Sequence, residues 1–187
     1  MATHRVEGYD TVQRMLHWLT VAFLLVLIPV GIAMTHPAFR PLQDTLFIIH
    51  KNGGVLLFLV LVARVGWRLT HRPSPQPAEL PTIHRRVAAF THFMLYVLLF
   101  TMVITGYLRV VGGGFPIELL DALGIPPLIG TMRETATIIS AVHKFTAYAL
   151  VVVIVVHVTA AIQHALVHRN SVMQRIWPPI APPAKAD

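Results

Sequence analysis

The stretch 138–166, IISAVHKFTAYALVVVIVVHVTAAIQHAL, decides the fold of this chain. It is longer than the ~20 apolar residues that cross a bilayer, yet it contains His143 and His157. Because 14 residues are almost four turns of an α-helix, the two rings leave nearly the same face, roughly 21 Å apart. Polar side chains inside a membrane segment are costly and tend to be functional. The stretch therefore predicts a transmembrane helix with two metal centres stacked along it.

Three further apolar runs, at 15–34, 46–65 and 87–111, are of similar length. The whole chain of 187 residues is 55% hydrophobic and only 12% charged, which does not suit a soluble domain. Since lipid leaves no partner for free backbone groups, continuous apolar runs of this kind form helices. We expect an all-α, integral membrane four-helix bundle that is one domain over 1–187. The expected helices are 11–34, 42–69, 82–111 and 134–168, with a short surface helix within 117–123 and Pro-rich extended segments at 71–77 and 177–183.

Lysine and arginine are distributed unequally between the two membrane sides. With four helices, both termini and the loop between the second and third helix share one side, which carries ten of these residues; the other side carries five. The side with more positive charge is normally cytoplasmic. The net charge of +7 is thus explained by topology and lipid headgroups, and we expect no nucleic-acid partner. The absence of cysteine excludes disulfides, thiolate-held iron–sulfur clusters and covalently attached haem.

Four of the eleven histidines form two pairs at matching depths. Chain direction places His17 and His157 near the cytoplasmic side, and His50 and His143 near the opposite side. Each pair could supply the two axial nitrogens of one haem iron in the core of the bundle. Two alternatives stay open: histidines that hydrogen-bond between helices, and zinc, although two ligands per level without carboxylate or thiolate suit zinc poorly.

Small residues follow three of these histidines. Positions three and four residues on share a helix face with the histidine, where a macrocycle would need space. Small residues also serve close helix packing in membranes, which is the alternative explanation. The small residues in question are Gly53, Gly54, Ala147, Ala160 and Ala161.

Two more histidines lie in the cytoplasmic half. His164 follows His157 by seven residues, so it shares that face about 10 Å nearer the cytoplasm. His92 lies in the same half of the third helix. Their imidazoles could bond and protonate a quinone carbonyl, or they could bond a haem propionate or a helix carbonyl.

Two lysines directly follow histidines of the opposite side. Lys51 comes after His50, and Lys144 comes after His143. Cations at these positions could neutralise haem propionates, or they could attract a small anion to the haem edge.

With its histidines in this order, the chain resembles the bacterial cytochrome b561 family. This four-helix di-haem group is related to the cytochrome b subunits of formate dehydrogenases and nickel–iron hydrogenases. The resemblance covers nearly the whole chain. Its local matches are Arg14-Met-Leu-His17-Trp18, Ile49-His50-Lys-Asn-Gly53-Gly54, His92-Phe-Met-Leu-Tyr96, and the set His143, His157 and His164.

The resemblance implies two non-covalent haems b. It implies that His17 and His157 are the axial ligands of the cytoplasmic haem, and that His50 and His143 are those of the periplasmic haem. It also implies a location in the bacterial inner membrane, surrounded by lipid, and the charge distribution places both termini in the cytoplasm.

The resemblance further implies a ubiquinone site, which we expect near His92 and His164. One stand-alone branch of the family looks like a superoxide oxidase, an enzyme that passes electrons from superoxide at the periplasmic face to ubiquinone. In such an enzyme Lys51 and Lys144 would attract the superoxide anion. The alternative is an electron-transfer membrane subunit that receives electrons from a partner dehydrogenase and passes them to quinone.

Overall fold

The computed structural model describes residues 8–71, 80–170 and 172–177. Four long helices dominate it: α1 (Thr11–Ala33), α2 (Gln43–Thr70), α3 (Thr82–Gly112) and α5 (Arg133–Leu166). Each is long and apolar enough to cross a membrane, and the described residues contain no strand. The predicted all-α, four-helix membrane fold is confirmed.

Two short helices lie in the connections at one end of the bundle. They are η1 (Pro37–Leu42), between α1 and α2, and α4 (Glu118–Ala122), within the stretch where a short helix was expected. We call this end of the bundle the hairpin end. The opposite end, where α1 begins and α5 ends, is called the terminal end. The expected extended segments at 71–77 and 177–183 fall almost wholly outside the described residues.

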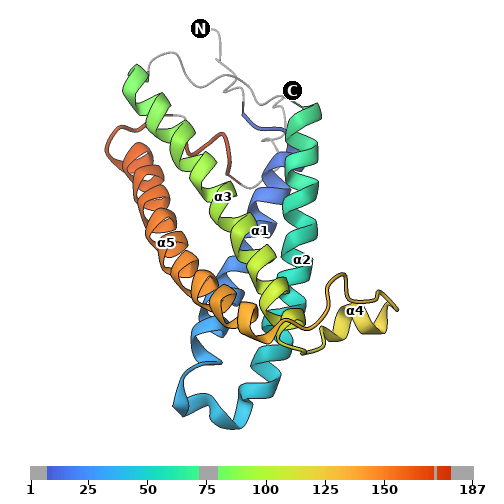
Figure 1. Ribbon diagram of the computed structural model, residues 1–187. Coiled ribbons are helices and arrows are strands. Elements are labelled where there is room, and N and C mark those ends of the chain that lie inside the picture. Colours follow the sequence, from blue (N-terminus) through green and yellow to red (C-terminus); the bar gives the residue numbers. More distant parts are fainter. Residues whose placement is uncertain (1–7, 72–79, 171, 178–187) are drawn as a thin grey trace, which may run out of the picture.

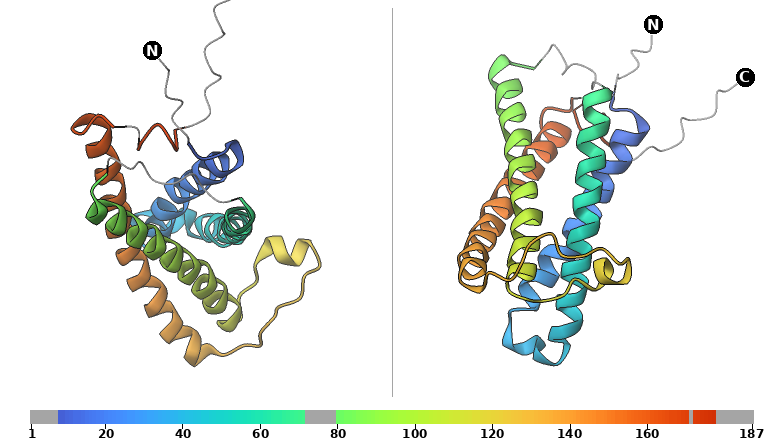
Figure 2. Two further views of the ribbon diagram at one scale, coloured as in Figure 1. Left: turned by 90° about the horizontal axis from the view of Figure 1, so that it is seen from above. Right: turned by 45° about the vertical axis from the view of Figure 1, so that its right-hand side comes forward.

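The long helices form two antiparallel pairs. Helix α1 packs along α2, α3 packs along α5, and contacts between α2 and α3 join the pairs. Figure 1 shows the two pairs diverging toward the terminal end. Both views in Figure 2 place α4 outside the bundle, beside α2.

A layer of buried leucines holds the two pairs together. Every long helix contributes to it. Leu150 lies seven residues from His143 and seven from His157, so the layer separates the two histidine levels by about 10 Å on each side. The leucines of this layer are Leu27, Leu57, Leu61, Leu99 and Leu150.

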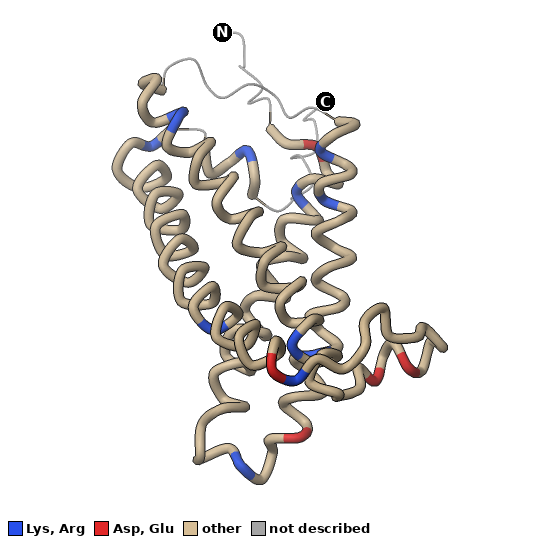
Figure 3. Tube along the Cα trace, viewed as in Figure 1, with Lys and Arg blue, Asp and Glu red and all other residues tan. Residues whose placement is uncertain are grey.

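The outer faces of the helices are apolar. Leu25, Phe90 and Val152 are each more than half exposed in the isolated chain, as lipid-facing side chains should be. Figure 3 shows charged residues gathered toward the two ends, with a long uncharged zone between them. This distribution fits a bilayer whose hydrocarbon surrounds the middle of the bundle.

Asp10 fixes the beginning of α1 against the end of α2. Its carboxylate accepts hydrogen bonds from the Gln13 backbone N–H at 2.8 Å, as an N-cap, and from the Trp67 indole N–H at 3.1 Å. Burial acts to raise the pKa of the Asp10 carboxyl, but these hydrogen bonds outweigh it and hold the pKa below its ordinary value. The terminal ends of α1 and α2 are therefore clamped together.

Candidate haem sites

His50 is oriented by the neighbouring helix α1. Its Nδ1 lies 3.1 Å from the carbonyl oxygen of Leu27. Because a carbonyl only accepts, the ring donates from Nδ1, and its Nε2 keeps a lone pair. A methyl group at Gly31 would come within 2.9 Å of His50 Cε1, so a glycine is needed for α1 to lie this close to the ring.

His143 is oriented in the same way by α3. Its Nδ1 lies 3.0 Å from the Thr105 hydroxyl oxygen, and the ring is buried. That hydroxyl donates its hydrogen to the Thr101 carbonyl at 2.6 Å, so its oxygen accepts from the histidine. Nε2 of His143 therefore also keeps a lone pair. Gly106 faces this ring as Gly31 faces the other, since an added methyl would lie 3.3 Å from His143 Cε1.

The two rings meet between the helix pairs. Their centroids are 6.3 Å apart and their planes are inclined by 81°. Two metal–imidazole bonds of about 2 Å each, plus the distance from each nitrogen to its ring centre, account for a separation of roughly this size. Hydrogen-bonded partners that fix the ligand tautomer are also typical of histidines that bind metals. His50 and His143 therefore fit the axial positions of one haem iron.

At the other level, His17 faces a cation. The Arg64 guanidinium nitrogen Nη2 lies 3.0 Å from His17 Nδ1, and the guanidinium lies 5.4 Å from the Tyr96 ring centroid. A guanidinium only donates, so Nδ1 of His17 is the acceptor and the ring proton is on Nε2. This is the reverse of the arrangement at His50 and His143.

His157 and His92 lie against each other at the level of His17. Their ring centroids are 5.2 Å apart, clearly closer than those of His50 and His143. This separation is too short for a metal bound between opposed rings. His17 lies within electrostatic range of both. The structure thus gathers the two predicted ligands of the second haem and a predicted quinone-site residue in one region.

His164 lies at the terminal end, in a cluster that the sequence did not predict. The Asn170 side-chain amide donates a hydrogen bond to His164 Nδ1 at 2.9 Å. The Val172 N–H donates to Asn170 Oδ1, which fixes the orientation of the amide. The N–H of His164 is therefore on Nε2. The His84 and His168 rings lie 6.1 and 5.3 Å from that of His164.

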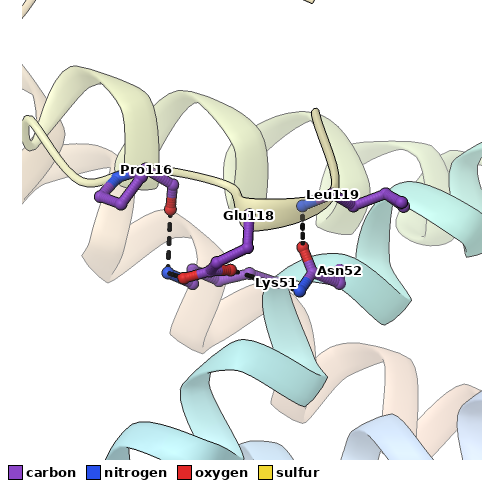
Figure 4. A network of polar contacts seen from close by, with 5 residues as sticks. All are labelled: Lys51, Asn52, Pro116, Glu118 and Leu119. Atoms are coloured by element: carbon purple, nitrogen blue, oxygen red, sulfur yellow. Dashed lines mark hydrogen bonds and ion pairs between the residues drawn. The ribbon is translucent and has the colours of Figure 1, made fainter. Parts of the chain in front are cut away.

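Lys51 connects α2 to α4. Its ammonium group donates to Glu118 at 2.6 Å and to the Pro116 carbonyl at 2.8 Å, while Asn52 bonds both Glu118 and the Leu119 N–H (Figure 4). Burial acts to raise the pKa of the Glu118 carboxyl, but the bonds from Lys51 and Asn52 outweigh it and hold the pKa below its ordinary value. The side chain of Lys51 is only 12% exposed, and its charge is offset.

Lys144, the other predicted anion-attracting residue, is exposed on α5. It directly follows His143, so its cation lies at the level of the His50–His143 site. Of the two predicted lysines, Lys144 is therefore the one more open to an anion from solution.

The small residues after His50 have different surroundings. A methyl group on Gly53 would come within 2.7 Å of the Leu27 side chain, whereas one on Gly54 would meet nothing within 4 Å. Gly53 thus serves close packing of α1 on α2, the alternative explanation given above. Gly54 leaves open space one turn from the predicted ligand, as a macrocycle would require.

Sequence reasoning missed the residues that orient the histidines. Arg64 carried a usable signal, because a charged residue within an apolar run is a functional candidate by default. Thr105, Gly31 and Gly106 carried none, since each lies on a different helix from the histidine that it contacts.

The haem assignment also agrees with the distribution of potential metal ligands. Across residues 8–71, 80–170 and 172–177, no three His, Cys, Asp or Glu side chains converge to hold a bare metal ion. A zinc site needs about four ligands, whereas a haem iron needs only two axial ligands from the protein.

Comparisons with known proteins identify the family of this chain. The family described as prokaryotic cytochrome b561 matches residues 8–179. Cytochrome b561 homolog 2 of Escherichia coli (strain K12) is 29% identical over 178 residues, which cover 93% of each chain. Cytochrome b561 homolog 1 of the same organism is 22% identical over 180 residues, covering 92% of this chain and 98% of the relative. The chain therefore belongs to the prokaryotic cytochrome b561 family, whose members bind haem b in the membrane and transfer electrons.

Proposed function

We propose that this protein is a di-haem oxidoreductase of the bacterial inner membrane that passes electrons from superoxide at the periplasmic face to ubiquinone at the cytoplasmic side. The observation that carries this proposal is the stacking of two histidine levels along α5. One level is the pair His50 and His143, with rings 6.3 Å apart. The other is the group of His17, His92 and His157.

In this proposal the protein holds and separates two redox centres. His50 and His143 would hold the periplasmic haem, and His17 and His157 would hold the cytoplasmic haem. Bound haem supplies reversible one-electron transfer, with a potential set by its ligands and surroundings. The leucine layer, which includes Leu150, lies between the two levels and keeps them apart without a charged group.

At the hairpin end, the chain attracts the anionic donor. Lys144 is exposed beside His143, and Arg109 is half-buried on α3 one turn beyond Thr105. Positive charge in this region raises the local concentration of an anion. Lys51 mainly holds α4 in place and adds little to the attraction of an anion, because Glu118 offsets its charge.

On the cytoplasmic side, His164 at the terminal end and His92 beside His157 serve the quinone. With its N–H on Nε2, His164 presents the donor that a quinone carbonyl requires. The reaction balances when two superoxide anions each lose one electron and leave as O2. One ubiquinone then takes the two electrons, together with two protons from the cytoplasmic side, to become quinol.

The test uses the purified full-length protein in detergent. We expect two haems per chain, reduction of both by a superoxide generator, and reoxidation on addition of a ubiquinone analogue. Superoxide dismutase should abolish the reduction. A protein that superoxide does not reduce would refute the proposed donor. If it also co-purified with a dehydrogenase that does reduce it, the alternative role as an electron-transfer subunit would replace the proposal.

A further inference from the structure

The two histidine levels differ in where their ring protons lie. At the first level, Nδ1 of His50 donates to the Leu27 carbonyl, and Nδ1 of His143 donates to the Thr105 hydroxyl. Both Nε2 lone pairs therefore point away from the hydrogen-bonded side. This level already has the tautomer that an axial ligand needs.

The second level has the opposite tautomer at His17. The donor Arg64 occupies the Nδ1 lone pair at 3.0 Å, which leaves the proton on Nε2. A neutral imidazole cannot accept a hydrogen bond at one nitrogen and offer a lone pair to iron at the other. His17 can therefore become an axial ligand through Nε2 only after the guanidinium has left Nδ1.

Arg64 has other partners close to its present position. The Thr20 hydroxyl lies 3.5 Å from its Nη1, and the Tyr96 ring lies beside its guanidinium on the α3 side. A guanidinium that leaves His17 therefore keeps an acceptor and an aromatic face, which matters for a charge that is half-buried among apolar helices.

We propose that Arg64 controls filling of the His17–His157 haem site: it holds His17 in the tautomer that cannot bind iron, so this site fills after the His50–His143 site. The inference rests on the ligand pairs of the proposed function. Arg64 is here a positioning residue, because it acts on the cofactor through His17. The hydrogen bond from Arg64 should lower the population of the His17 tautomer that binds iron by about tenfold. Haem uptake by the His17–His157 site should therefore be slower by the same factor.

The test measures haem uptake by each site separately. Full-length protein is produced under haem limitation and mixed with haemin in detergent, and the Soret band is followed by stopped flow. The variant His50→Ala leaves the His17–His157 site, and His17→Ala leaves the His50–His143 site. We expect uptake in the His50→Ala protein to be about tenfold slower than in the His17→Ala protein.

The decisive comparison adds a second substitution to His50→Ala. Arg64→Met should speed uptake about tenfold, whereas Arg64→Lys, which keeps a donor, should remain slow. Arg68→Met is the matched control: it removes a positive charge one helical turn away, on an exposed side chain, and should leave the rate unchanged.

Nitrogen-15 NMR of histidine-labelled, haem-free protein gives a second readout that does not depend on uptake. We expect the His17 proton on Nε2 in the natural sequence and on Nδ1 for a larger fraction of the time in Arg64→Met. The inference would be overturned if the natural protein carries the His17 proton on Nδ1, or if the His50→Ala, Arg64→Met double variant takes up haem no faster than His50→Ala alone. A His50→Ala protein that binds no haem at equilibrium would instead refute the ligand pairs themselves, and the inference with them.

Discussion

At the residue scale, the ligands of the His50–His143 site depend on partners from neighbouring helices. Thr105 is the clearest case, because its hydroxyl both accepts from His143 and is itself held by the Thr101 carbonyl. Partners of this kind typically change metal affinity by about 10–100-fold when they are removed.

We therefore predict that Thr105→Val weakens binding of one haem by at least about tenfold. Thr105→Ser, which keeps the hydroxyl, should restore binding. The haem-to-protein ratio and the reduced absorbance spectrum after dilution and gel filtration measure this effect. Retention of both haems by the valine variant at the affinity of the natural protein would contradict it.

The sequence was informative about histidine depth and uninformative about histidine partners. The depth of His50 and His143 follows from chain direction and helix count alone, and the structure brings these rings together. Contacts such as Leu27 with His50 depend on how neighbouring helices rotate about their axes, and one chain's periodicity does not encode that rotation.

At the element scale, α4 shows how polar contacts with a neighbouring helix can hold a very short helix in place. Five residues are too few for a stable isolated helix, so tertiary contacts must supply its stability. The sequence indicated a short helix here, but it did not indicate that Lys51 and Asn52 of α2 would be its attachment point. From sequence alone, Lys51 is a cation beside a haem; in the structure it is the attachment point of α4.

The ion pair of Lys51 with Glu118 makes this attachment sensitive to acid. Because the folded pKa of Glu118 lies below its unfolded value, the pair stabilises α4 fully above that value, near 4.5, and loses this effect as the pH falls through the folded pKa. We predict faster amide exchange in α4, corrected for the intrinsic rate, at pH 4 than at pH 6.

The matched variants for this prediction lie on the same helix. Glu118→Gln should show fast exchange at both pH values, whereas Asp121→Asn, which alters an exposed carboxylate, should behave like the natural protein. Equal exchange in all three proteins at pH 6 would mean that the ion pair does not hold α4.

At the scale of the whole molecule, hydropathy was sufficient to predict the number and order of the long helices. It could not predict that α1 pairs with α2 and α3 with α5, because lipid-facing and core-facing side chains are equally apolar here. Orientation in the membrane remains a prediction from charge.

We predict that both termini lie in the cytoplasm, because ten Lys and Arg residues lie on that side of the membrane and five on the other. A fluorescent protein fused after residue 187 should fluoresce, and alkaline phosphatase fused there should be inactive. The same two reporters inserted after Gly124, in the connection at the hairpin end, should give the opposite result. An active phosphatase at the C-terminus would reverse the proposed direction of electron flow.

The division of His50 and His143 between two helix pairs also bears on assembly. One ring belongs to the pair α1 and α2, and the other to the pair α3 and α5, so a haem iron held by both rings would add a further link to the leucine layer that joins the two pairs. Residues 1–76 and 77–187, co-expressed as separate polypeptides, should co-purify in higher yield when haem is plentiful than when it is scarce, and replacing both His143 and His157 by alanine should remove this dependence on haem. The haem would then contribute to the association of the two membrane hairpins as well as to electron transfer.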